Sequence, residues 1–215
     1  QRCIKALREL ALRSDGRLEL IEADALEVDL ALNVPGLGAE RLTVVANLPY
    51  NVGTPLLLGW LDRLTRIESM TLMFQREVAE RLTAAPGTRS YGRLSVLVQW
   101  LCEARCLFHL PSRAFTPPPQ VASTLVGLVP RAFPLAPADK AVLERVVAAA
   151  FGQRRKMLRS SLKALTPQAD ALLERAGIPG TARAEAVPVE GFCRLAEAYR
   201  AMRPARSLRA ARGTG

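Results

Sequence analysis

The sequence predicts an α/β domain followed by a small all-α domain, and three observations support this prediction. Over the first 130 residues, short apolar runs rich in β-branched side chains alternate with segments whose apolar residues recur at helical spacing. A proline-containing linker follows at 130–137, and every periodic segment beyond it is helical. We therefore divide the chain into an α/β domain at 1–130, a helical domain at 131–203 and a basic tail at 204–215 that is expected to be disordered.

The individual elements follow from local patterns. The expected order in the first domain is helix 1–13, strand 18–21, strand 42–46, helix 54–61, strand 69–74, helix 75–82, helix 94–101, strand 104–110 and strand 123–129. The last two strands are joined by a proline-rich loop without a helix, so we expect an antiparallel edge on that side of the sheet. In the second domain, helices are expected at 138–151, 154–165, 167–176 and 188–202.

Composition and charge narrow the class of protein. The chain of 215 residues is 49% hydrophobic, enough to bury a core, and holds 30 Lys and Arg against 20 Asp and Glu. The net charge of +10 favours a polyanionic partner, nucleic acid first, and a basic protein without such a partner is the alternative. The sequence shows no apolar run of membrane-spanning length and no signal peptide. We therefore expect a cytoplasmic protein with no membrane partner. The four cysteines form no CxxC pair, so we expect reduced thiols and no metal site.

The first domain is organised around the tetrapeptide Asn-Leu-Pro-Tyr at 47–50. An apolar strand at 42–46 precedes it, and the helix at 54–61 follows, with Thr54 as its expected N-cap and Pro55 at its first position. In open α/β sheets, ligands bind beyond the carboxyl ends of the strands. The sequence therefore predicts a ligand site at this turn.

The four residue types of the turn suit a flat ring that carries an amino group. The side-chain oxygen of Asn47 and the carbonyl of Leu48 can each accept one N–H of the amine. Pro49 restricts the backbone of the residue before it, which aims that carbonyl, and Tyr50 offers a ring for stacking. A polar turn after a strand, without a ligand, is the alternative explanation of the tetrapeptide.

These residues resemble a known family. The tetrapeptide is similar to the [N/D]-x-P-[Y/F/W] motif of methyltransferases that act on exocyclic amines of nucleobases. The longer string NLPYNVGTPLL resembles the ribosomal RNA adenine dimethyltransferases of the KsgA type. The resemblance continues through EADAL at 22–26, MFQREVAERL at 73–82, YGRLSVLVQ at 91–99, AFTPPPQVAST at 114–124, QRRKMLR at 153–159 and RAEAVPVEGFCRLA at 183–196.

The resemblance implies a Rossmann-like methyltransferase domain that uses S-adenosylmethionine, without a metal, to dimethylate adenines of small-subunit ribosomal RNA during ribosome assembly. It also implies a monomer whose partner is the precursor of the small ribosomal subunit. The catalytic residues would be Asn47, Leu48, Pro49, Tyr50 and Phe115, with Phe115 covering a flipped base. The cofactor would be bound by Asp24, Ala25 and Asn47, although from the residues alone a loop or helix-capping role is the preferred explanation of Asp24. RNA would be bound by Arg154, Arg155, Lys156, Arg159 and Lys163, whose alternative role is a solvated helix face.

The sequence departs from the family at its beginning. The Gly-rich cofactor loop and the acidic residue that holds the ribose are not found in it, so we expect the first two strands of the family domain to be missing from this sequence. Without a partner strand, the apolar run around Val44 is expected to leave an exposed sheet edge. The alternative function is therefore a non-catalytic factor that binds ribosomal RNA during ribosome assembly. A methyltransferase-derived mitochondrial transcription factor and a DNA adenine methyltransferase share some of these motifs and rank lower.

Overall fold

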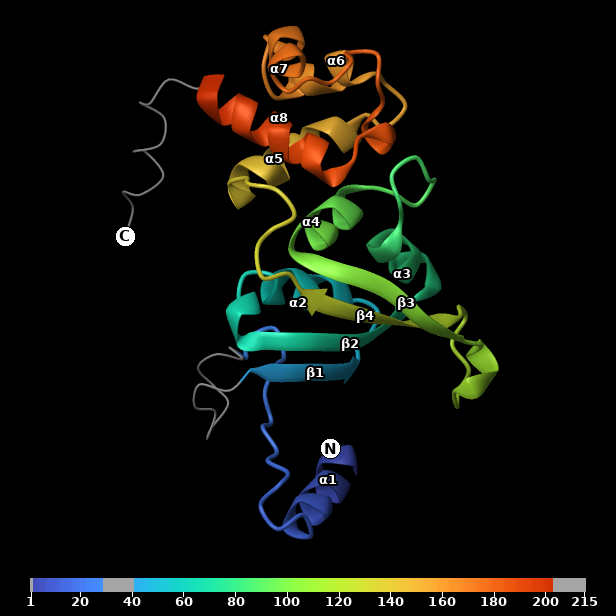
Figure 1. Cartoon of the computed structure of the whole chain (residues 1–215). Helices are drawn as coiled ribbons and strands as arrows, with labels where there is room; N and C mark the ends of the chain where they lie inside the picture. Colours follow the sequence, from blue (N-terminus) through green and yellow to red (C-terminus); the bar gives the residue numbers. More distant parts are fainter. Residues whose placement is uncertain (1, 29–40, 203–215) are drawn as a thin grey trace.

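The computed structural model describes residues 2–28 and 41–202, which contain one four-stranded mixed sheet and two groups of helices (Figure 1). The strand order is β1-β2-β4-β3. β1 runs parallel to β2, whereas β4 is antiparallel to both β2 and β3, which confirms the expected antiparallel edge. The strands are β1 (Leu42–Asn47), β2 (Ile67–Gln75), β3 (Cys102–Leu110) and β4 (Ser123–Pro130).

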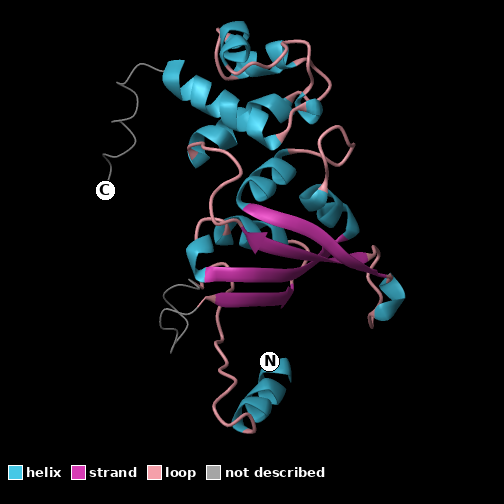
Figure 2. Ribbon diagram, in the orientation of Figure 1, coloured by secondary structure: helices cyan, strands magenta, loops and turns pink. Residues whose placement is uncertain are grey.

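Three helices pack on one face of this sheet (Figure 2). They are α2 (Gly53–Trp60), α3 (Arg76–Thr83) and α4 (Arg93–Leu101), and their apolar side chains form one cluster with those of β2 and β4. Along β1 the side chains alternate, so that Val44 packs against this cluster while Val45 is 75% exposed. The first helix, α1 (Arg2–Leu12), lies apart from the sheet in Figure 1.

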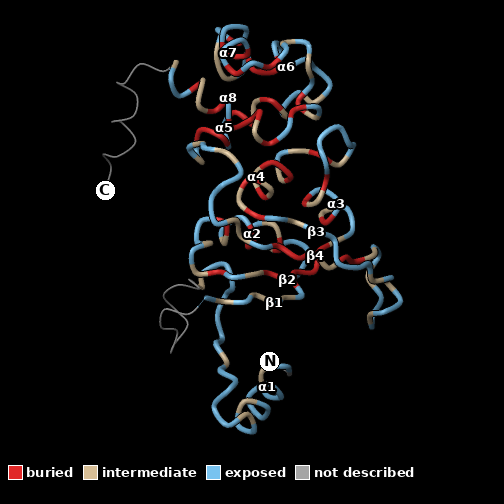
Figure 3. The backbone as a smooth tube through the Cα atoms, in the orientation of Figure 1, coloured by how far each residue is buried: buried red, intermediate tan, exposed pale blue. Residues whose placement is uncertain are grey.

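The opposite face of the sheet is open to solvent (Figure 3). Among the strands that the structure describes, β1 pairs only with β2 and so forms an edge, as the sequence predicts. Large apolar side chains are exposed on or near this face, including those of Val45, Leu107, Phe108 and Val129.

The second half of the chain forms a separate apolar cluster from α5 (Lys140–Gly152), α6 (Leu158–Ser161), α7 (Ala169–Arg175) and α8 (Val189–Met202). The side chain of Asp139 caps α5 by accepting a hydrogen bond of 3.0 Å from the amide of Val142. α4 contributes Val96 and Trp100 to this cluster and Val98 to the sheet cluster, so it lies between the two cores. A domain boundary at residue 130 therefore stays a prediction. None of the helices in the described ranges is both long and apolar enough to cross a membrane.

Three local predictions are wrong. The segment 18–21 is not a strand, because no strand in the described part of the chain pairs with it. The helix expected at 154–165 begins only at Leu158, since the amide of Leu158 donates to the carbonyl of Ala182 (2.8 Å). That bond joins the chain to a neighbouring segment at the point where a continuous helix would need the amide. α2 begins at Gly53, so its N-cap position is Val52 instead of the expected Thr54.

Candidate active site

The NLPY turn leaves the carboxyl end of β1 and closes directly into α2. The carbonyl of Pro49 accepts hydrogen bonds from the amides of Val52 and Gly53, both at 3.1 Å. Gly53 is buried, and a Cβ there would lie 3.2 Å from Cε1 of Phe74. The absence of a side chain at this position therefore allows α2 to begin close against β2, which fixes the direction in which the turn leaves the strand.

The turn presents two free acceptors. Asn47 is exposed at the end of β1, where its backbone is paired with Met73 of β2. Within the described ranges, neither the side-chain amide of Asn47 nor the carbonyl of Leu48 has a hydrogen-bond partner. Both groups are therefore available to accept hydrogen bonds from a ligand.

One cavity of about 400 Å³ gathers all five residues predicted to be catalytic. Phe115 reaches it from the loop at 111–122 between β3 and β4, which lies beside the end of β1 although it is far along the chain. Met73 of β2 and three further residues of the loop that carries Phe115 complete the lining, and none of these four was among the residues predicted to form the site. The full lining is Asn47, Leu48, Pro49, Tyr50, Met73, Phe115, Thr116, Pro117 and Pro119.

Tyr50 is anchored by a residue that the sequence reasoning missed. Its hydroxyl oxygen lies 2.8 Å from Oγ of Ser123, the first residue of β4, which is fully buried. The available signal was the serine at the end of the AFTPPPQVAST string, where a polar residue opens an apolar strand.

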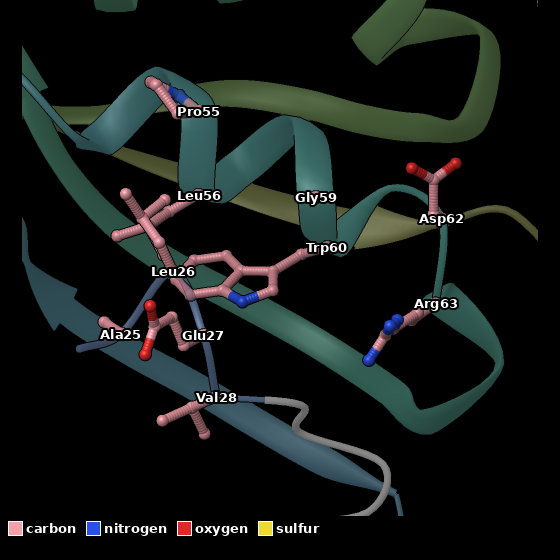
Figure 4. Close-up of a pocket in the computed structure, with 10 residues that line it drawn as sticks. All are labelled: Ala25, Leu26, Glu27, Val28, Pro55, Leu56, Gly59, Trp60, Asp62 and Arg63. Carbon is pink, nitrogen blue, oxygen red and sulfur yellow. The ribbon is translucent and has the colours of Figure 1, made fainter. Parts of the chain in front are cut away.

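The predicted cofactor residues are not brought together. One carboxylate oxygen of Asp24 accepts a hydrogen bond of 2.9 Å from the amide of Leu26, a local turn that agrees with the alternative loop role. Ala25 lines a different cavity of about 250 Å³, between residues 25–28 and α2, where Leu26 and Trp60 lie side by side (Figure 4). Neither Asp24 nor Ala25 lines the cavity that holds Asn47. The cavity that holds Asn47 therefore does not include the other two residues predicted to bind S-adenosylmethionine.

The predicted RNA-binding residues divide into two groups. Arg154 is only partly exposed and is used inside the protein: its guanidinium pairs with Glu185 (3.0 Å) and donates to the carbonyl of Arg89 (2.6 Å). Arg154, Arg155 and Lys156 lie in a turn before α6, so the prediction that they share a helix face is wrong. The remaining four cations are exposed: Arg155, Lys156, Arg159 and Lys163.

Two adjoining cavities of about 400 and 500 Å³ lie between α3, the loop at 85–92 and residues 151–154. Arg81, Ser90 and Arg154 line both of them. Arg93 lines the first and Arg89 the second, and both side chains are exposed. We call this depression the arginine groove. Glu77 and Glu80 also line it, but they are paired with Arg81 and Arg76 respectively.

The fold places the protein in the class of Rossmann-like methyltransferases. A dimethyladenosine transferase from Plasmodium falciparum superposes with a TM-score of 0.74 at 23% identity, over 90% of this chain and 77% of that chain. The 23S rRNA methyltransferase ErmE superposes with a TM-score of 0.65 at 27% identity, over 93% of this chain and 78% of that chain.

Sequence comparison identifies the family within that class. The family model for ribosomal RNA adenine dimethylase matches residues 1–201, and the chain belongs to this family. It is 59% identical over 197 residues to the ribosomal RNA small subunit methyltransferase A of Rhodospirillum rubrum, which covers 92% of this chain and 67% of the relative. The protein of the same name from Paramagnetospirillum magneticum is also 59% identical over 197 residues, with 92% and 68% covered. The chain thus spans about two thirds of the length of these relatives.

Proposed function

We propose that the protein transfers methyl groups from S-adenosylmethionine to the exocyclic amine of adenines in small-subunit ribosomal RNA. The observation that carries this proposal is the single cavity that unites Asn47, Leu48, Tyr50 and Phe115. Membership of the family and the names of the relatives support the choice of adenine and of small-subunit RNA. We further propose that the protein acts as a monomer in the cytoplasm on a precursor of the small subunit.

The chemistry follows from two hydrogen-bond acceptors in the protein and one amine that donates to both. The exocyclic amine of adenine is a poor nucleophile because its lone pair is delocalised into the ring. Hydrogen bonds from its two N–H groups to Oδ1 of Asn47 and to the carbonyl of Leu48 would favour a pyramidal nitrogen and direct the lone pair outward. S-adenosylmethionine, when bound, supplies an electrophilic methyl group. Methylation leaves the nitrogen positively charged and acidic, so it loses one proton readily to solvent. The contribution of the chain is therefore positioning and electrostatics, with no strong base required.

The target base must leave its stack to enter the cavity. Tyr50 and Phe115 lie on different segments and line the same cavity, so they are suited to hold the base between them. Stacking on an aromatic side chain contributes about 1–3 kcal/mol per base. Buried Leu48 and the prolines of the loop at 111–122 limit the movement of these walls.

We propose that the RNA backbone follows the arginine groove toward the turn at 154–156. Arg93 and Arg155 are exposed and have no partner among the described residues, so they can contact phosphates without losing an internal ion pair. Each of the changes Arg93→Ala and Arg155→Ala should reduce the slope of log affinity against log salt by about 1. The control is Arg175→Ala, because Arg175 is exposed at the end of α7 and lines neither cavity. Slopes that stay unchanged in Arg93→Ala and Arg155→Ala would contradict this path.

A second candidate function is RNA binding without catalysis during ribosome assembly. The observation that favours it is the position of Asp24 and Ala25 outside the cavity of Asn47.

Transfer of a labelled methyl group to small-subunit RNA separates the two candidates. Asn47→Ala should abolish transfer and leave RNA binding intact, because the side chain of Asn47 makes no hydrogen bond with the other described residues and is proposed to contact only the target amine. Asn51→Ala is the matched control, an exposed asparagine on the same turn that does not line the cavity. Near-normal transfer by Asn47→Ala would refute the proposed site. RNA binding by the unaltered protein without any transfer would support the second candidate.

A further inference from the structure

The hydrogen bond between Tyr50 and Ser123 joins two segments whose relative position matters for the proposed reaction. We propose that Ser123 is a positioning residue that holds the ring of Tyr50 as a fixed wall for the target base. This inference rests on the proposed function, because the ring matters only if a base occupies the cavity.

Ser123 is a rigid anchor. It is fully buried, and its backbone pairs with Gln75 at the end of β2 and with Leu110 at the end of β3. The carbonyl of the preceding residue, Ala122, accepts a hydrogen bond of 2.9 Å from the amide of Arg76. The hydroxyl of Ser123 is therefore carried by the first residue of an inner strand, where pairing with β2 and β3 restrains the backbone on both sides.

Tyr50, by contrast, needs an anchor. It is 38% exposed and lies in the turn between β1 and α2, outside regular structure. An exposed aromatic side chain in a turn can change rotamer, which would move the ring in or out of the cavity. The bond to Ser123 restricts this rotation. It also engages the hydroxyl, so that the ring face is the part of Tyr50 left to meet a base.

The same bond connects the two aromatic walls. The loop that carries Phe115 ends at Ser123, where β4 begins. Tyr50 lines the same cavity from another segment, the turn after β1. Ser123 thus ties the NLPY turn to the end of the Phe115 loop, which sets the spacing between the two rings.

The test is a double-mutant cycle of Tyr50→Phe and Ser123→Ala, two changes that remove one hydroxyl each and add no atoms. Each single variant should lower kcat for methyl transfer by about 2- to 10-fold, the range expected for one hydrogen bond, with KM for RNA changed less than about twofold. The double variant should be no slower than the slower single variant, since both changes break the same bond. Ser161→Ala is the matched control, because Ser161 is a buried serine in α6. The kcat and KM of this variant should equal those of the unaltered protein.

A second measurement makes the test independent of catalysis. The chain has three tyrosines, so in protein labelled with 3-fluorotyrosine the resonance of Tyr50 is identified by its loss in Tyr50→Phe. Ser123→Ala should shift this resonance, whereas Ser161→Ala should not.

Three results would overturn the inference. These are an unmoved fluorine resonance in Ser123→Ala, single-variant effects on kcat that multiply in the double variant, and a kcat of Ser123→Ala equal to that of the unaltered protein. If the unaltered protein transfers no methyl group, the proposed function fails, and so does the proposed role of the Tyr50 ring as a wall for the target base. The fluorine spectrum then still decides whether Ser123 holds the ring.

Discussion

Replacing Arg154 by alanine is expected to destabilise the protein, whereas the same change at Arg155 should weaken only RNA binding. The two arginines are neighbours in the turn before α6, but of the two only Arg154 makes an ion pair or a hydrogen bond through its side chain within the described structure. Its guanidinium joins Glu185, ahead of α8, to the carbonyl of Arg89 in the loop at 85–92. It therefore fastens one side of the arginine groove to the helical half of the chain.

The magnitude follows from the exposure of these contacts. The side chains of Arg154 and Glu185 are 38% and 32% exposed, so solvent screens the ion pair, which should contribute about 0.5–1 kcal/mol. The hydrogen bond to the carbonyl of Arg89 has a charged donor and should contribute about 1 kcal/mol more in this partly exposed position. Arg154→Ala should thus lower the free energy of unfolding by about 1.5–2 kcal/mol, or the melting temperature by about 3–8 °C for a chain of this size.

Urea unfolding followed by circular dichroism measures the first effect, and RNA affinity against salt concentration measures the second. The stability of Arg155→Ala should stay within about 0.5 kcal/mol of that of the unaltered protein, because the Arg155 side chain is exposed and makes no hydrogen bond or ion pair with the other described residues. The reasoning would be refuted if Arg154→Ala cost no more stability than Arg155→Ala. It would also be refuted if Arg155→Ala left the salt dependence of RNA binding unchanged.

Three further predictions concern two glycines in helices, the pH dependence of stability and the reactivity of the cysteines. In α8, Gly191→Ala would bring a Cβ to 2.6 Å from Cγ1 of Val187. The resulting strain should exceed the gain in helix propensity and lower the free energy of unfolding, measured in urea, by about 1–2 kcal/mol. The control is Gly59→Ala in α2, which should be neutral or stabilising because nothing lies within 4 Å of its Cβ. Burial raises the pKa of the Cys102 thiol to about 12, so stability should fall as pH rises from the ordinary thiol pKa toward that value, because the thiol ionises earlier in the unfolded chain. In the folded protein near pH 8, iodoacetamide should modify the exposed Cys106 well before Cys102, and equal rates measured by mass spectrometry would argue against this burial.

Much of the fold could be predicted because its signals are local. The apolar run ending at Asn47 predicted β1 almost to the residue, and the proline-rich loop after β3 predicted the antiparallel edge. The helix after β2 was predicted with similar accuracy, since its apolar residues recur at helical spacing. Such patterns lie within one element and depend little on the rest of the chain.

The failures came where a distant segment decides the local structure. Residues 18–21 have the composition of a strand, but a strand requires a neighbour to pair with. The helical pattern from 154 to 165 is interrupted because the segment near Ala182 takes the amide of Leu158. Arg154, which lies in that interrupted turn, makes an ion pair and a hydrogen bond within the protein, and its predicted role in RNA binding stays a prediction.

By itself, the sequence determined the nature of the candidate site. The NLPY turn supplies its acceptors and one of its aromatic rings from four consecutive residues, and proline restricts their backbone without help from elsewhere. Only the tertiary structure decided that Phe115 and Met73 line the same cavity and that Ser123 anchors Tyr50. The physical reason is that these contacts depend on strand order and register, which place β4 beside β2 and the loop before β4 beside the end of β1. No local pattern of residues encodes that arrangement.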